Sequence, residues 1–197
     1  MLGPMPDYRR NRVPGGTYFF TVNLHDRRSE LLVARIDVLR AAVRAVRAQA
    51  PFHIDAWVVL PEHMHCIWTL PPAEGLRPPA QLRRRERGIW QRRFWEHTIR
   101  DDRDYAAHMD YVHFNPVRHG LVARAADWPY SSFRRCVALG LYPADWCAGG
   151  DKPAGPASDD ERRLDSARQV RPEGLGYAGA PGLKTEARCE SRPALAG

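Results

Sequence analysis

The 197-residue chain is long enough for one well-cored domain with a short appendage, and it leaves little room for two full domains. Its formal net charge is +7, and all of this excess lies before Cys147, where 22 basic residues stand against 15 acidic ones; the rest of the chain has 8 of each. Only two of the 30 basic residues are lysines, so arginine, which grips phosphates in a two-pronged way, dominates and nucleic acid is the natural partner.

A basic surface that merely contacts solvent is the competing interpretation, and charge alone does not separate the two. A membrane protein is not expected, because no apolar run approaches the ~20 residues that span a bilayer and nothing resembles a signal peptide. Four cysteines without Cys-x-x-Cys spacing predict free thiols; they are Cys66, Cys136, Cys147 and Cys189. We therefore expect a soluble, cytoplasmic protein.

The first half of the chain predicts a strand, a helix and a hairpin. Aromatic and β-branched residues over 17–24 indicate a strand, and apolar residues at three- and four-residue steps over 34–49 indicate an amphipathic helix that Pro51 ends. Two apolar strands follow at 54–60 and 63–70. Their connection through Pro61 and Glu62 is so short that an antiparallel hairpin is the economical arrangement.

Two histidines, His63 and His65, begin the second hairpin strand. Side chains alternate between faces of a strand, so this spacing sends both imidazoles to one side and Met64 to the other. Such a pair can hold a metal ion, although a His-x-His on a strand is more often structural or on the surface. The other residues that could join the pair decide between these two interpretations.

The second half begins with a proline-broken segment, 71–88, in which only residues 80–87 could form helical turns. Aromatic residues over 90–99 predict another strand. Asp101, Asp102 and Asp104 then supply the acidic first turn of a second major helix. Pro116 lacks a backbone donor and should kink or end that helix near Asn115, which places Tyr111 in its last regular turn.

This helix has a polar stripe formed by His108, Tyr111 and Asn115. A surface position is the more common interpretation for His108, with an orienting role as the alternative, and His113 and His119 receive no role. Residues 121–141 predict short helix and loop. The segment 148–197 has too little apolar content to offset its ordering entropy, so we expect one domain over 1–147 and a disordered tail over 148–197.

The two histidines and the stripe suggest a chemistry. Two imidazoles and an amide oxygen suit a divalent transition ion and leave coordination positions for a phosphate oxygen. A phenol is a poor nucleophile at neutral pH, but it can attack a phosphodiester whose charge a nearby metal neutralises. Asn115, four residues after Tyr111, shares its helix face and could reach the same ion. A tyrosine buried for packing alone is the plain alternative.

Several ordered blocks of the chain resemble the REP-associated tyrosine transposases, which are bacterial HUH-type enzymes with a single nucleophilic tyrosine. The resemblance extends over about residues 8–146 and is specific because it rests on five separate blocks: YFFTVNL at 18–24, AWVVLPEHMHCIWTLP at 56–71, WQ and RFWEH at 90–97, DYVHFNPVRHG at 110–120 and DWPYSSF at 127–133.

The resemblance implies an α+β fold, the ferredoxin-like HUH nuclease fold, in which helices pack on an antiparallel sheet with the His pair on a central strand. It implies His63, His65 and Asn115 as ligands of a divalent metal ion, Mg²⁺ or Mn²⁺, and Tyr111 as the nucleophile. It also implies a monomer that binds hairpins of repetitive extragenic palindromes and cleaves single-stranded DNA beside them, through a 5′-phosphotyrosine with a free 3′-hydroxyl.

The chain departs from the family in one place, because its segment 71–88 is shorter than the family's basic helix there. The alternative function is therefore a catalytically inactive or decaying DNA hairpin-binding protein, and a metal phosphohydrolase that uses water is a more distant third. For DNA contacts the sequence favours two arginine groups, namely Arg9, Arg10 and Arg12 near the start and Arg83, Arg84, Arg85 and Arg87 in the shortened segment.

Overall fold

The computed structural model describes residues 13–72, 89–91, 94–147 and 153. Its centre is a four-stranded sheet of β1 (Thr17–Asn23), β2 (His53–Val59), β3 (His63–Thr69) and β4 (Trp95–Thr98), in the order β2-β3-β1-β4 with every neighbouring pair antiparallel. The predicted hairpin is β2–β3, and His63 and His65 lie on a central strand as predicted. The strand order is that of a ferredoxin-like sheet, which confirms the predicted α+β class.

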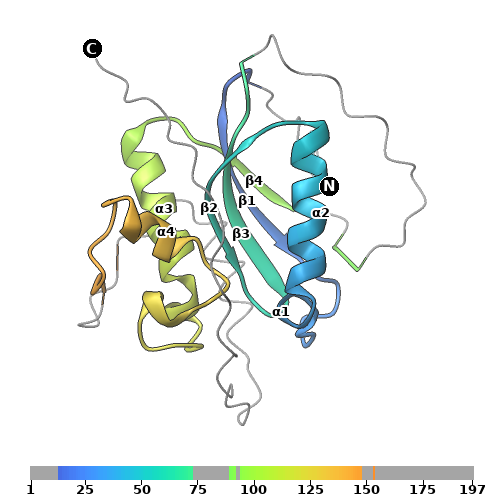
Figure 1. The fold of residues 1–197 in the computed structure, drawn as a ribbon, viewed down its shortest axis with the longest axis vertical. Helices are drawn as coiled ribbons and strands as arrows, with labels where there is room; N and C mark the ends of the chain where they lie inside the picture. The colour runs from blue at the N-terminus through green and yellow to red at the C-terminus, as the bar shows by residue number, and fades with distance from the viewer. Residues whose placement is uncertain (1–12, 73–88, 92–93, 148–152, 154–197) are drawn as a thin grey trace, which may run out of the picture.

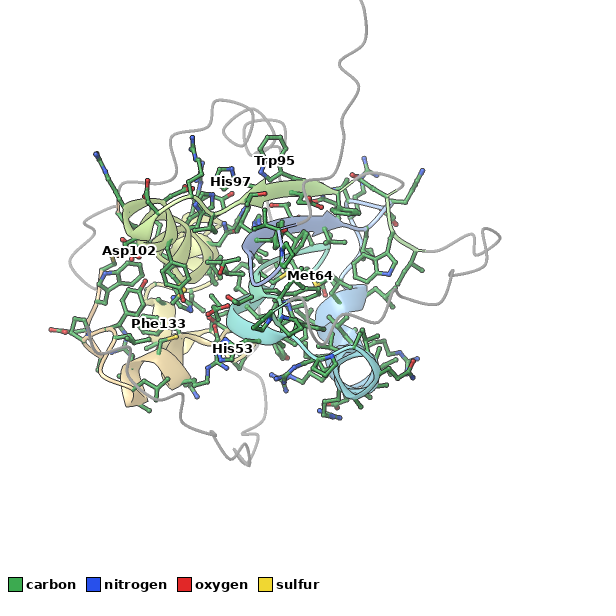
Figure 2. All side chains as sticks on the ribbon, turned by 90° about the horizontal axis from the view of Figure 1, so that it is seen from above. His53, Met64, Trp95, His97, Asp102 and Phe133 are labelled. Atoms are coloured by element: carbon green, nitrogen blue, oxygen red, sulfur yellow. The ribbon has the colours of Figure 1, made fainter. Side chains whose placement is uncertain are left out.

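Helices cover both faces of this sheet. α1 (Leu31–Ala34) and α2 (Ile36–Gln49) lie on one side, whereas α3 (Asp102–Arg118) and α4 (Phe133–Ala138) lie on the other, with the short 3₁₀ helix η2 (Ala125–Asp127) beside α3 (Figure 1). Seen from above, side chains fill the space between the sheet and each helical layer (Figure 2). The α3 side is the one that matters for function.

Strand alternation decides which residues face α3. Phe19 on β1 contacts His65 of the sheet and also His108 and Tyr111 of α3, so the face that holds Phe19 is the α3 face. His63 and His65 share it with Thr21, which lies directly opposite His65 in the β1–β3 register. A register shift between Ile54 and Ala56 marks a bulge in β2.

The free edge of β2 is covered by the chain that follows η2. Val59 N–H donates to the Tyr130 carbonyl and Ser132 N–H donates to the Trp57 carbonyl, both at 2.8 Å. The buried Trp128 indole adds a bond from Nε1 to the Val59 carbonyl at 2.9 Å. An edge strand with unpaired backbone groups invites aggregation, so this segment protects the hairpin that holds the histidines.

α3 begins where the sequence predicted and ends later. Asp101 is its N-cap, and the carboxylate accepts a hydrogen bond from Asp104 N–H at 2.8 Å. The helix was expected to kink or end near Asn115 because of Pro116; it does not end there, because it continues to Arg118 with Pro116 inside it. The last turn is closed by Gly120, at φ +64°, whose N–H bonds to the Val117 carbonyl while Leu121 N–H bonds to the Pro116 carbonyl.

Asp101→Ala should therefore destabilise the fold by about 1 kcal/mol, because the Asp104 amide in the first turn of α3 would lose its side-chain acceptor. The free energy of unfolding from urea titrations measures this. Asp101→Asn is the matched control, since asparagine caps about as well as aspartate and should leave the midpoint nearly unchanged. Equal losses in the two variants would show that charge, and not the cap, matters at this position.

Other element boundaries shift slightly. The predicted helix over 34–49 is α2, which begins at Ile36, and a separate short helix, α1, precedes it. The predicted strand over 90–99 narrows to Trp95–Thr98, and Trp90 makes an isolated bridge to Leu24. Short helix within 121–141 is confirmed by η2 and α4. The helical turns proposed for 80–87 and the tail over 148–197 fall outside the described residues, apart from Pro153.

Among the described residues, no helix combines the length and apolarity needed to cross a membrane. Three of the four cysteines lie in this part of the chain, and all three are free as predicted: Cys66, Cys136 and Cys147. Cys66 faces the α2 side of β3, and burial raises the pKa of its thiol, so it acts as a small apolar residue and not as a nucleophile.

Candidate active site on the α3 face of the sheet

His63 and His65 are both fully buried, with ring centroids 4.9 Å apart and planes nearly perpendicular. Each ring has its Nδ1 beside a polar neighbour: His65 Nδ1 lies 2.8 Å from Thr21 Oγ1, and His63 Nδ1 lies 3.0 Å from Glu62 Oε1. Metal-binding histidines usually donate one ring N–H to such a partner, which orients the other nitrogen toward the ion. Here Nε2 is the nitrogen on the opposite side of each ring.

Glu62 connects the site to a basic residue. Its Oε1 is shared by His63 and by Arg27 Nη2 at 3.5 Å, and Arg27 Nη1 donates to Asn23 Oδ1 at 3.1 Å. This places a carboxylate and a guanidinium at the end of the β3 strand where the histidines begin. The carboxylate can accept a hydrogen bond from His63 Nδ1–H, which fixes the orientation of the ring.

Tyr111 is brought against the histidine pair by α3. The phenol ring and the His65 ring have centroids 5.1 Å apart at 78°, and the Tyr111 side chain is only 4% exposed. Phe19 packs edge-on against the same ring at 5.9 Å, and the Arg118 guanidinium lies 5.5 Å from its centroid. Two residues 46 positions apart in the sequence therefore meet in one buried site, as predicted.

Asn115 lies one helical turn after Tyr111 and is fully buried. Within the part of the chain that the structure describes, neither Oδ1 nor Nδ2 of its side chain has a hydrogen-bond partner. A buried amide without partners costs about 1–3 kcal/mol, so such a group usually has a ligand in the working protein. Asn115 lies on α3 one turn after Tyr111, which packs on His65, and one turn before His119, which packs on His63. An amide oxygen combined with two imidazoles would fit a divalent metal ion, and the partnerless amide of Asn115 supports this fit.

Sequence reasoning missed His119. Its ring centroid is 5.2 Å from that of His63, at the residue that caps the C-terminal end of α3. The signal was available, because residues 111, 115 and 119 recur at four-residue steps on one helix face. It was lost because Pro116 was expected to end the helix before His119 could join that face.

The structure corrects the prediction for His108. The surface position favoured for it is wrong: the side chain is 2% exposed and its ring lies 4.8 Å from Phe19. Burial lowers the pKa of His108 and outweighs the hydrogen bond to the Asp104 carbonyl, which raises it. A neutral ring therefore packs against the same phenylalanine that contacts His65 and Tyr111.

His113 is also buried, on the side of α3 that faces α4. Its Nε2 lies 3.0 Å from Ser132 Oγ and 3.8 Å from Cys136 Sγ, and its ring packs edge-on against Phe133. Burial lowers its pKa to about 3, with help from the nearby Arg135 charge. His113 is thus a neutral core residue that joins two helices and not a member of the site.

The arginines proposed for DNA contacts all lie outside the described residues, and they remain predictions: Arg9, Arg10, Arg12, Arg83, Arg84, Arg85 and Arg87. The structure does describe all four residues proposed for catalysis and metal binding. His63 and His65 come from β3, and Tyr111 and Asn115 come from α3.

Comparison with known proteins gives no matching family model. The chain is 52% identical over 153 residues to the REP-associated tyrosine transposase of Escherichia coli K12. This alignment covers 72% of this chain and 91% of that protein. It is 41% identical over 169 residues to a Haemophilus influenzae protein provisionally given the same name, covering 75% and 96%. A solved structure of a REP-associated tyrosine transposase bound to a REP hairpin matches with a TM-score of 0.64 at 50% identity, covering 72% of this chain and 91% of that one.

Proposed function

Because this chain belongs to the REP-associated tyrosine transposases, we propose that it cleaves and joins single-stranded DNA beside a palindromic hairpin with Tyr111 as its nucleophile. The observation that carries the proposal is the contact between the Tyr111 and His65 rings at 5.1 Å in a buried site. The hairpin partner is inferred from the solved relative, which is bound to one.

The reaction exchanges one phosphodiester for another. The Tyr111 oxygen forms a bond to phosphorus as its proton leaves, the bond from phosphorus to the 3′-oxygen breaks, and that oxygen takes up a proton to become a free 3′-hydroxyl. The phosphotyrosine keeps the energy of the broken linkage. A second 3′-hydroxyl can therefore reverse the step and join another strand without a nucleotide cofactor.

A divalent ion, Mg²⁺ or Mn²⁺, held by His63, His65 and Asn115 would act as a Lewis acid on the scissile phosphate. Thr21 and Glu62 fix the ring orientations through the two Nδ1 atoms. The edge-on packing of Tyr111 against His65 and Phe19 holds the phenol beside that position. Burial excludes competing water from the nucleophile.

The test uses a REP-type hairpin with a single-stranded foot, labelled in turn on each side of the cleavage position. With Mg²⁺ or Mn²⁺, the protein should retain the label on the 3′ side of the break through denaturation and release the label on the 5′ side. Attachment of the opposite fragment would contradict the proposed polarity. Turnover without any covalent species would favour a water-using hydrolase, and tight binding without cleavage would favour the hairpin-binding alternative, for which the comparisons give no support.

Three further points belong to this proposal. We propose that residues 1–147 form the catalytic unit, that the protein acts as a monomer, and that it works in the cytoplasm where its DNA substrate lies. Sedimentation of the protein alone and with hairpin DNA would test the second point, since a dimeric species that alone forms the covalent adduct would overturn it.

Thr21→Val should weaken the affinity of the site for its metal ion by roughly 10–100-fold. Valine keeps the shape of the buried side chain and removes the oxygen that orients His65. The concentration of Mn²⁺ that gives half-maximal adduct formation measures the effect. Thr17→Val is the matched control, since Thr17 lies at the other end of β1 and its hydroxyl lies 2.8 Å from that of Thr69 on β3, away from the histidines. An equal shift in the two variants would assign it to general loosening of β1.

A further inference from the structure

A second group of side chains able to bind a metal lies on the same face of the sheet, nearer the start of α3. His97 comes from β4, and Asp104 and His108 come from the first turns of α3. Each of the three can place one ligand atom within 4.8 Å of the others. The cluster is separate from the candidate active site: none of its residues is among His63, His65, Tyr111 and Asn115.

Asp104 joins the two rings. Its Oδ2 lies 2.7 Å from His97 Nε2, and its Oδ1 lies 3.1 Å from His108 Nδ1. The two imidazoles stack with centroids 4.6 Å apart and planes inclined by only 14°. A neutral imidazole is the form that binds a metal ion, and this arrangement brings two imidazoles and a carboxylate together.

We propose that His97, Asp104 and His108 form a second metal site, suited to Zn²⁺ or a similar transition ion, that fastens the start of α3 to β4. Two imidazoles and one carboxylate are a common ligand set for zinc, with water in the fourth position. Asp104 and His108 lie four residues apart on one helix face, a spacing that lets two side chains bind one ion.

The geometry requires little movement. A tetrahedral ion with bonds of ~2.0–2.2 Å keeps its ligand atoms roughly 3.3–3.5 Å apart. The separations of 2.7 and 3.1 Å, which involve the two different oxygens of Asp104, need to open by less than about 1 Å, and the longest separation, within 4.8 Å, needs to close by at most roughly 1.5 Å. His108 Nδ1 would exchange its bond to the Asp104 carbonyl for the ion. That carbonyl still accepts its regular helical hydrogen bond.

Burial and access also fit a bound ion. His108 is almost fully buried, whereas the side chains of His97 and Asp104 are 18% and 12% exposed. The partial exposure of His97 and Asp104 gives an ion and its water access from solvent. His108 also packs on Phe19, which contacts Tyr111, so an ion here would hold the tyrosine helix in place against the sheet.

The test separates this site from the first one. In a His63→Ala/His65→Ala background, calorimetric titration with Zn²⁺ should show one bound ion, and Co²⁺ should give the visible absorption of a low-coordinate site. Adding His97→Gln should weaken the affinity at least ~100-fold through loss of an imidazole ligand. Adding His53→Ala should change nothing, because His53 is an exposed histidine paired with Asp55 outside the cluster.

A second measurement needs no change in the active site. Zn²⁺ at about 100 times its dissociation constant should raise the melting temperature of the wild-type chain by roughly 5 °C or more, and His97→Gln should remove the part of this rise that the second site contributes. The zinc content of the wild-type chain should also fall by one ion in His97→Gln. The proposal would be overturned if zinc binding were the same with and without His97→Gln, or if the His63→Ala/His65→Ala variant bound no ion. The three side chains would then only join β4 to α3 by hydrogen bonds.

Discussion

Tyr111→Phe is expected to abolish the covalent adduct between protein and hairpin DNA, with a loss of at least about 10⁴-fold in the rate of cleavage. The substitution removes only the hydroxyl oxygen that would bond to phosphorus. The phenyl ring keeps its packing against Phe19 and His65, so the fold and the geometry of the metal ligands should be preserved. Denaturing gel electrophoresis of labelled DNA measures the adduct directly.

Tyr105→Phe is the matched control for this experiment. Tyr105 lies on the same helix and also loses one hydroxyl, which donates to Asp55 Oδ1 at 3.3 Å away from the histidine pair. Its adduct yield should stay close to that of the wild type. An adduct that persists in Tyr111→Phe would remove Tyr111 from its proposed role, and hairpin binding measured in parallel would show whether that variant had lost its fold.

The second large effect is expected from the metal ligands. His65→Ala should reduce cleavage by about 10³-fold or more, because an uncompensated phosphate charge repels the attacking phenol oxygen. Removal of divalent ions from the wild-type protein with a chelator should produce the same loss. Hairpin binding should change only a few-fold, since phosphate contacts made elsewhere carry most of the affinity.

The pattern across variants distinguishes a shared ion from two independent side chains. If His63 and His65 hold one ion, the double variant His63→Ala/His65→Ala should be hardly worse than either single variant. His53→Ala, an exposed change elsewhere, controls for non-specific metal loss and should leave cleavage intact. Multiplicative losses in the double variant, or full cleavage in the presence of chelator, would contradict a common metal site.

Much of the site followed from local patterns in the sequence. Alternation along β3 placed His63 and His65 on one face, and the four-residue step from Tyr111 to Asn115 placed those two on one helix face. Both patterns depend only on the repeat of a strand or helix, so they can be read from a single segment. The acidic turn at Asp101 likewise marked the start of α3 because a capping side chain acts on its own helix.

The errors have a common origin in contacts between segments. Pro116 was expected to end α3, yet the helix continues because the Gly120 turn and the packing of buried residues around Pro116 compensate for one lost hydrogen bond. His108 was assigned to the surface because its helix position alone does not reveal that Phe19 of β1 lies over it. His119 was missed because Pro116 was expected to disrupt the helix before it.

The sequence by itself thus predicted most of the elements, their apolar faces and the residues that we propose for metal-assisted strand transfer. Only the tertiary structure decided that β1 lies between β3 and β4, that Tyr111 meets His65, and that His97, Asp104 and His108 gather in a second cluster. The physical reason is that hydrophobic burial is non-directional, so periodicity shows which face of each segment must be covered. Which distant segment covers it depends on the packing of the whole chain.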